Sequence, residues 1–222
     1  MTARPFRFPQ PLYPILDPSW TKGDFLDFAE RVLRAGTALV QLRVKGASTR
    51  EFLELARELR RRTRERGVLL VVNDRVDVAL AAGADGVHLG QRDLPPEEAR
   101  RLLGPSAVVG WSTHCVEEIE RANHRSHLLD YVSFGPVFPT STKSDAEAPK
   151  GLEALREACR KSRLPVVAVG GISLDRIPCV LEAGARAAAV ISALSLHPAP
   201  EEALSRVLGG PVLATRPSTR EG

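Results

Sequence analysis

Three polar side chains alternate in the segment QLRVK, directly after a short apolar run: Gln41, Arg43 and Lys45. Side chains at alternate positions of an extended chain point to the same side, so these three are predicted to converge. A planar guanidinium and a compact ammonium together suit the oxygens of a phosphate group. The segment therefore indicates a phosphate-binding site, although a pair of surface cations at a strand end would give the same pattern.

Two aspartates follow the next two apolar runs, in the segments VVNDRVDVAL and HLGQRDLPPEE. Asp74, which stands beside Asn73, and Asp93 each precede a predicted helix, where an Asn or Asp side chain commonly caps the helix. One or two carboxylates, completed by water and substrate phosphates, are also the usual protein ligands of Mg²⁺. Together with the cationic segment, the pair favours a Mg²⁺ site built from Asp74 and Asp93.

Two later segments add hydroxyl groups and a further cation. GWSTHC contains Ser112 and His114, and the long loop FGPVFPTSTKSDAEAPKG contains Thr140, Thr142 and Lys143. Ser112 does not stand in a GxSxG turn, which argues against a serine hydrolase. His114 has a side chain that can transfer protons near neutral pH, and a structural role is equally open. The threonines and the lysine of the loop are typical of phosphate binding.

The last two apolar runs end in Gly170-Gly171-Ile172-Ser173 and in Val190-Ile191-Ser192-Ala193. Backbone amides at such positions bind phosphate, and α/β barrels often place a phosphate site after their seventh and eighth strands. Two glycines in a tight turn are the structural alternative. Two separated anion sites would indicate two phosphorylated ligands.

These residues follow short apolar runs that alternate with amphipathic helices. The eight runs are residues 12–16, 38–42, 68–72, 86–89, 107–109, 131–134, 165–169 and 187–191. They are rich in valine and leucine without apolar/polar alternation, as in parallel strands that are buried on both faces. The predicted fold is α/β, a single-domain (β/α)8 TIM barrel, with an open doubly wound sheet as the alternative. Barrel chemistry occurs at the carboxyl ends of the strands, where the polar residues above stand.

The helices carry their own boundary signals. Ser48 begins the capping box Ser-Thr-Arg-Glu, which predicts a helix that continues until Gly67. We expect residues 1–10 to be an N-terminal extension, residues 11–208 to be the barrel, and residues 209–222 to be a flexible C-terminal tail.

Composition restricts the class of protein. The 222 residues are 43% hydrophobic and 26% charged, an ordinary globular balance. A net charge of +4 argues against a nucleic-acid partner. No apolar run approaches the roughly 18 residues of a membrane span, and the first residues do not resemble a secretory signal, so we expect a cytoplasmic protein without a membrane partner. The three cysteines have no ligand spacing and are expected to be reduced.

Six segments together resemble the thiamine phosphate synthase family, also called thiamine-phosphate pyrophosphorylase. They are QLRVK, VVNDRVDVALAAGADGVHLGQRDLP, GWSTH, DYVSFGPVFPTSTK, PVVAVGGI and VISALS, and the resemblance covers residues 12–195. It implies a transferase that joins hydroxymethylpyrimidine diphosphate to hydroxyethylthiazole phosphate and releases pyrophosphate. The implied reaction depends on Mg²⁺ and is dissociative: pyrophosphate leaves first, and the thiazole nitrogen captures the pyrimidine methyl cation.

The resemblance also implies a role for each site residue. It places the pyrimidine against Gln41 and Asn73 and the Mg²⁺ ion on Asp74 and Asp93. The diphosphate would be held by Arg43, Lys45, Ser112, Thr142 and Lys143, with Thr140 lining the site. The catalytic residues among these would be Arg43, Lys45, Ser112 and Lys143. The thiazole phosphate would be bound by Gly171 and by the amides near Ile191 and Ser192.

Two other functions remain open at this point. The related thiazole tautomerase would move a proton on a thiazole carboxylate phosphate, with His114 as the acid/base, and would not need the diphosphate-binding set. A sensor of phosphorylated ligands would bind without turnover. Departures from the family pattern at Arg92 and in residues 123–129 and 144–150 leave room for a paralogue. The sequence leaves the oligomeric state open, including a homo-oligomer.

Overall fold

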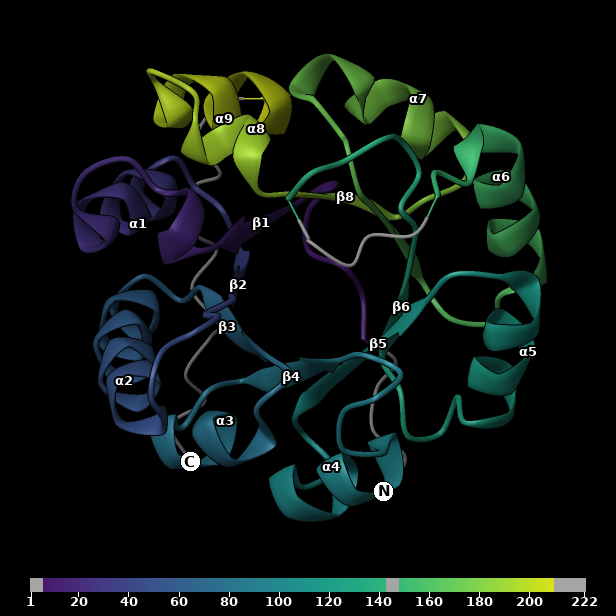
Figure 1. The fold of residues 1–222 in the computed structure, drawn as a ribbon, viewed down its shortest axis with the longest axis horizontal. Coiled ribbons are helices and arrows are strands. Elements are labelled where there is room, and N and C mark those ends of the chain that lie inside the picture. Colours follow the sequence, from purple (N-terminus) through teal and green to yellow (C-terminus); the bar gives the residue numbers. More distant parts are fainter. Residues whose placement is uncertain (1–5, 143–147, 210–222) are drawn as a thin grey trace, which may run out of the picture.

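The computed structural model describes residues 6–142 and 148–209. In these residues eight parallel strands close into a barrel in the order of the chain, and helices surround it (Figure 1). The strands are β1 (Leu12–Leu16), β2 (Leu39–Leu42), β3 (Leu69–Asn73), β4 (Gly86–Leu89), β5 (Val108–Thr113), β6 (Tyr131–Phe134), β7 (Val166–Val169) and β8 (Ala187–Val190). The predicted TIM barrel is confirmed, and the open-sheet alternative is wrong.

Each strand is followed by helical segments on the outside of the barrel. The α-helices are α1 (Phe25–Arg34), α2 (Thr49–Glu65), α3 (Val76–Ala82), α4 (Pro96–Leu103), α5 (Val116–His124), α6 (Gly151–Lys161), α7 (Ile177–Glu182), α8 (Ser192–Ser195) and α9 (Pro200–Leu208). Short 3-10 helices occupy Pro18–Trp20 and Leu174–Arg176. Lys143 and residues 210–222 of the expected C-terminal tail lie outside the described residues.

Local signals explain where several helices begin. The capping box that starts α2 is present, since Ser48 Oγ accepts from Glu51 N while the Glu51 side chain accepts from Ser48 N. The capping alternative for the aspartates is wrong. Among the described residues no side chain caps α3 or α4, whose N-cap positions are Arg75 and Pro95. The carboxylates of the site are therefore not used by the helices that follow them.

The core has two parts, one on each side of the strands. Side chains that point outward from the barrel pack against the helices. Side chains that point inward fill the barrel interior, and they include Phe8, Leu39, Val71, Val108 and Tyr131. Near their carboxyl ends β2 to β6 carry polar residues at inward positions, such as Gln41, Asn73 and His88, whereas the inward residues of β7 and β8 are apolar. The filled interior thus forms the floor on which a site at that end is built.

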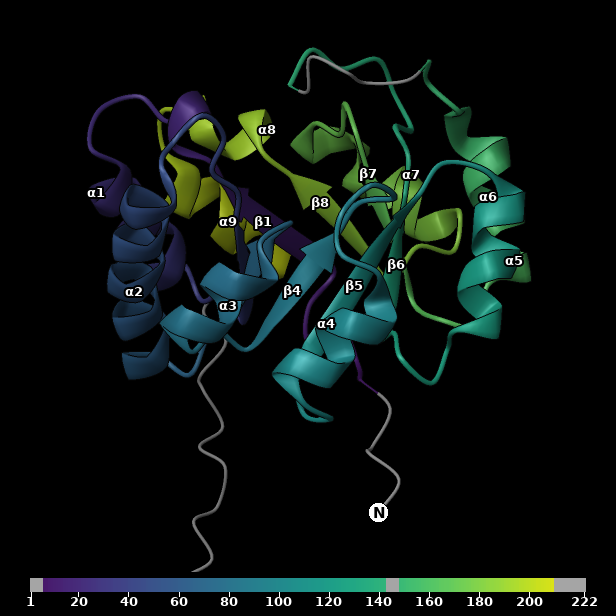
Figure 2. The same cartoon turned by 60° about the horizontal axis from the view of Figure 1, so that its bottom comes forward.

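The segment before β1 closes the opposite end of the barrel (Figure 2). Phe8 is buried, and its ring meets those of Tyr13 and Tyr131 with centroids 5.5 and 5.1 Å apart. Gln10 joins the segment to the barrel, because its side chain donates to Gly36 O and accepts from Ala38 N. Residues 8–10 of the expected extension therefore pack as part of the barrel.

We expect Phe8→Ala to lower the free energy of unfolding by about 3 kcal/mol, because it leaves a cavity under the two tyrosine rings. Urea denaturation measures the loss. Phe8→Leu is the matched control, since it keeps most of the buried volume and should cost less than about 1.5 kcal/mol. Equal stability of Phe8→Ala and the unmodified protein would show that the segment does not seal the barrel.

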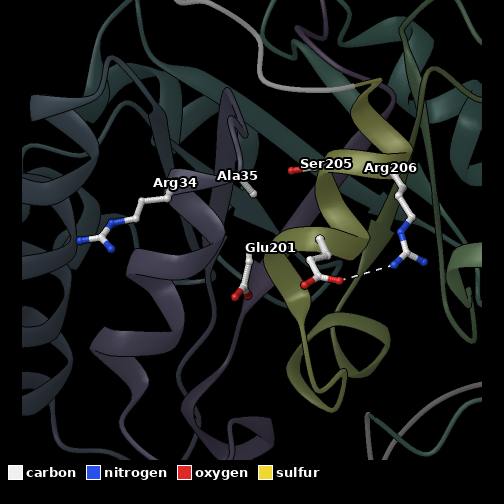
Figure 3. A pocket seen from close by; sticks show the side chains of 6 residues that line it. Arg34, Ala35, Glu201, Ser205 and Arg206 are labelled. Carbon is white, nitrogen blue, oxygen red and sulfur yellow. Dashed lines mark ion pairs between the residues drawn. The ribbon is translucent and has the colours of Figure 1, made fainter.

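Helices α1 and α9 meet where the ring of helices closes. Arg31 Nε donates to Glu201 Oε2 across this contact at 2.9 Å. Figure 3 shows a hollow there, lined by Arg34, Ala35 and residues of α9. Arg206 and Glu202 form an ion pair along α9, with 3.5 Å between Arg206 Nη2 and Glu202 Oε2. The end of α1 leads into the amino end of β2, so this hollow lies away from the carboxyl ends of the strands. Its mixed charges do not indicate an anion site.

Candidate active site

A cavity of about 470 Å³ opens at the carboxyl ends of the strands. The loops after β2, β3, β4 and β6 and the residues after β7 and β8 all contribute to its wall. The predicted site residues that line it are Arg43, Lys45, Asn73, Asp74, Asp93, Ser112, His114, Thr140, Thr142, Gly171, Ile191 and Ser192. Gln41 lies below this set and Lys143 is outside the described residues. Segments far apart in the sequence thus meet at one opening.

Arg43 reaches the cavity from a buried position. Its guanidinium donates to the carboxylate of Asp17, which is fully buried in the turn after β1. The same carboxylate accepts from the backbone N and the hydroxyl of Ser19, at 2.9 and 2.7 Å. A buried carboxylate with several donors is held firmly, so Asp17 fixes the direction of Arg43.

Lys45, Asp74 and Asp93 form a charged cluster on the cavity wall. Lys45 Nζ lies 2.6 Å from Asp74 Oδ2, and the two carboxyl groups share a hydrogen bond. Burial acts to raise the pKa of Asp74, but the hydrogen bonds from Lys45 and Asp93 and the lysine charge outweigh it and hold that pKa below its ordinary value. Burial and the neighbouring Asp74 raise the pKa of Asp93. The two carboxylates therefore repel each other when both are ionised.

The residues of this cluster fit a divalent cation. Asp93 Oδ2 accepts from Gly90 N at 2.6 Å, which fixes one carboxylate, and Asp74 has a left-handed backbone with φ 65°. A strained conformation of this kind persists where the surroundings enforce it and is common at functional sites. Two adjacent carboxylates with free space beside them suit Mg²⁺, which keeps waters and takes substrate oxygens. In the described residues no group of three or more His, Cys, Asp or Glu side chains forms a closed metal site.

Gln41 and Asn73 stand at different depths. Asn73 ends β3 and lines the cavity. Gln41 is inside the barrel, where its Nε2 donates to the hydroxyl of Tyr13 at 3.1 Å. Gln41 points to the inward side of β2, as predicted. Arg43 and Lys45 lie beyond the end of the strand and reach the cavity, whereas the Gln41 side chain is buried in the barrel interior beneath it. Alternation predicted the shared side but not the depth.

Ser112 and His114 both line the cavity but have different partners. Ser112 lies inside β5, which extends past the predicted run, and its Oγ is 3.0 Å from His88 Nε2. His114 Nδ1 is 3.0 Å from Glu118 Oε2, and the same oxygen accepts from His114 N at 2.7 Å. Among the described residues no side chain caps α5, and His114 is instead bound to Glu118 in the first turn of that helix.

The described part of the loop between β6 and α6 lies above the carboxyl ends of the strands (Figure 2). Its Thr140 and Thr142 line the cavity. Thr140 Oγ1 accepts from Thr142 N at 3.2 Å and lies 3.2 Å from the second hydroxyl. This loop also packs on the turn after β7, where a Cβ on Gly171 would lie 2.3 Å from Pro139 O. Gly171 has φ 62°, so both space and backbone conformation require glycine there. Gly171 therefore allows the loop between β6 and α6 to approach the turn after β7 closely.

Sequence reasoning missed several cavity or supporting residues. Asp17 directly follows the first apolar run, so the rule that selected polar residues at strand ends would also have selected Asp17. His88 stands between two buried apolar residues of β4, and period-two alternation marks it as inward. Glu118 and Gln91 carry no such signal, because each reaches the site from a loop or helix: Gln91 Nε2 donates to Ser112 O at 2.6 Å.

Known proteins are similar to this chain over most of its length. The profile of the family described as Thiamine monophosphate synthase matches residues 12–194. The thiamine-phosphate synthase of Chlorobium luteolum is 44% identical over 178 residues, 80% of this chain and 83% of that protein. The thiamine-phosphate synthase of Syntrophomonas wolfei is 44% identical over 184 residues, 82% of this chain and 87% of that protein.

A solved structure extends the similarity to three dimensions. The thiamine phosphate pyrophosphorylase from Pyrococcus furiosus superimposes with a TM-score of 0.78 at 35% identity, covering 90% of this chain and 96% of that one. Among the described residues no helix is long and apolar enough to cross a membrane.

Proposed function

Because the chain belongs to the thiamine monophosphate synthase family, we propose that it is the transferase that couples hydroxymethylpyrimidine diphosphate to hydroxyethylthiazole phosphate. The products are thiamine phosphate and pyrophosphate. The observation that carries the proposal is the single cavity in which Arg43 and Lys45 stand beside Asp74 and Asp93, opposite the glycine turn after β7. Cations and paired carboxylates suit a metal-bound diphosphate, and the turn suits a second phosphate.

The reaction breaks the bond between the pyrimidine methylene carbon and the diphosphate oxygen. The bonding electrons leave with pyrophosphate, so negative charge grows on the leaving group while the carbon becomes cationic. The thiazole nitrogen, which carries no proton, then donates its lone pair to that carbon. No general base is required. The site therefore has two tasks: to stabilise the departing anion and to hold the two rings in line.

The first task, stabilising the departing pyrophosphate, falls to the charged residues after β2, β3 and β4 and to Ser112. Arg43, fixed by Asp17, and Lys45 supply positive charge where the diphosphate oxygens would lie, and Ser112 would donate a hydrogen bond to them. Asp74 and Asp93 would hold Mg²⁺, which supplies further positive charge beside the leaving group when it is bound. Because these charges are fixed before the reaction, they stabilise the negative charge that grows on the leaving group more than the charge of the bound substrate.

The second phosphate would bind at the far wall. Gly171, Ile191 and Ser192 line the cavity there, at the end of β7 and at the start of the short helix α8. Barrels use this position repeatedly for phosphate, through backbone N–H groups. Asn73 would meet the pyrimidine between the two anion sites, Thr142 would contact the diphosphate from above, and Thr140 would line the site beside it.

An assay with both phosphorylated rings, with and without Mg²⁺, tests the function directly. Pyrophosphate and thiamine phosphate should appear in equal amounts, and only when both rings are present. A protein that binds both rings and releases neither product would instead be a sensor.

Lys143→Ala separates the synthase from a tautomerase. We expect the coupling rate to fall about 100-fold, because the family resemblance assigns the Lys143 cation to the diphosphate, although this residue lies outside the described ones. A proton shift on a thiazole carboxylate phosphate does not involve a diphosphate, so unchanged turnover in that reaction would favour the tautomerase. His114→Ala is the matched control, since the synthase reaction has no proton for this side chain to move.

A further inference from the structure

A continuous line of hydrogen bonds runs through the barrel directly beneath the cavity. Gln41 Nε2 donates to the Tyr13 hydroxyl at 3.1 Å, and that oxygen lies 3.0 Å from the Tyr131 hydroxyl. The Tyr131 hydroxyl is 2.9 Å from His88 Nδ1. His88 Nε2 is 3.0 Å from Ser112 Oγ. Ser112 lines the cavity, and the other four described residues of this line do not. We call these four residues the interior relay: Gln41, Tyr13, Tyr131 and His88.

The barrel register assembles the relay from neighbouring strands. His88 pairs in register with Gly110, where a Cβ would lie 2.1 Å from Cζ of Tyr131. The glycine therefore leaves the space that the Tyr131 ring occupies. The ring also stacks on His88, with centroids 5.4 Å apart and planes 19° apart. His88 is thus fixed between a phenol on one side and Ser112 on the other.

Both phenols keep their protons. Burial raises the pKa of Tyr13 above its ordinary value, and the hydrogen bonds with Gln41 and Tyr131 do not offset it. Burial, together with the charge that Tyr13 would carry, raises the pKa of Tyr131. Each hydroxyl therefore has one proton to donate and an oxygen that accepts.

The line has one direction when every buried proton on it is given an acceptor. The amide nitrogen of Gln41 only donates, so the Tyr13 oxygen accepts and its proton is available to Tyr131. Tyr131 in turn donates to His88 Nδ1. A neutral imidazole that accepts at Nδ1 carries its proton on Nε2, and this proton is donated to Ser112 Oγ.

The Ser112 oxygen thus accepts from below, and its own proton points away from the relay. Ser133 Oγ lies at a longer 3.4 Å from the same His88 Nε2. We propose that the interior relay is a positioning device that presents the Ser112 hydroxyl as a hydrogen-bond donor to the diphosphate. This step rests on the function proposed above. The opposite direction would turn the Ser112 lone pairs toward an anion and would weaken its binding.

The protonated nitrogen of His88 is the first test and does not depend on activity. In the free, full-length protein at pH 8, two-bond ¹⁵N–¹H correlation should show His88 with its proton on Nε2 and a bare Nδ1. Tyr131→Phe identifies the signal, since it removes the hydroxyl that faces Nδ1. A proton on Nδ1 would overturn the proposal, even if the protein couples both rings.

A double-mutant cycle is the second test. Tyr131→Phe should lower kcat about tenfold with a smaller change in KM, because a donor to growing negative charge acts mainly in the transition state. In a Ser112→Ala background the same change should have no further effect, since the relay acts through that hydroxyl. The same tenfold loss in both backgrounds would contradict the relay.

Thr37→Val is the matched control for deleting a buried hydroxyl. Thr37 Oγ1 donates to Leu39 O at the other end of the barrel, and its removal should leave kcat unchanged. If the unmodified protein gives no product while the proton lies on Nε2, the proposed function fails and only the hydrogen-bond direction of the relay is supported.

Discussion

Asp93→Asn is expected to lower the coupling rate about 1,000-fold while leaving the protein at least as stable. The side chain is one of two adjacent carboxylates on the cavity wall, and the amide that replaces it is a weak ligand for Mg²⁺. The stability result has a separate cause. The pKa of Asp93 is raised by burial and by Asp74, so ionising it costs free energy in the folded protein at neutral pH, and a neutral side chain avoids this cost.

Steady-state turnover over a range of Mg²⁺ concentrations and thermal unfolding measure the two effects. Asp77→Asn is the matched control, because this exposed aspartate on α3 pairs with Arg75 outside the cavity. Its turnover should remain that of the unmodified protein. Full activity of Asp93→Asn at low Mg²⁺ would remove this carboxylate from the proposed metal site.

Arg43→Ala should reduce both turnover and stability. Turnover falls about 1,000-fold because a fixed cation beside the departing diphosphate is lost. The free energy of unfolding falls by about 3–5 kcal/mol because the fully buried Asp17 carboxylate loses its charged partner. Urea denaturation and the coupling assay report the two losses separately.

A second variant distinguishes the two roles of the guanidinium. Arg43→Met combined with Asp17→Asn removes the buried pair as a whole, and most of the lost stability should return. Turnover should not return, because the cavity still lacks the cation. Recovery of turnover in this double variant would show that Arg43 serves the fold and not the reaction.

Much of the barrel was predictable from the sequence because its signals are local. A run such as Val68–Val72 is apolar without alternation, and this alone indicates a strand covered on both faces. The capping box at Ser48 fixes the start of α2, and Gly83 ends α3 with φ 64°, a conformation that favours glycine. Each of these features depends on residues within a few positions of one another.

The candidate site was predictable only in part. The rule that chemistry stands at strand ends selected Arg43, Asp74 and Asp93, and the structure brings all three to one cavity. It did not decide between helix caps and site carboxylates, because both roles use the same residue before a helix. The N-cap positions Arg75 and Pro95 exclude the helix caps, and the metal role of the two aspartates stays a prediction.

The sequence by itself determined where each of the eight described strands begins, to within one residue, and which family pattern the chain follows. Only the tertiary structure decided the pairs: Asp17 with Arg43, Lys45 with Asp74, and His88 with Ser112. The physical reason is that alternation fixes the direction of a side chain, whereas contact depends on the stagger between strands and on how far each loop extends past its strand. Partners that are 24 to 29 positions apart in the chain become neighbours only when the barrel closes.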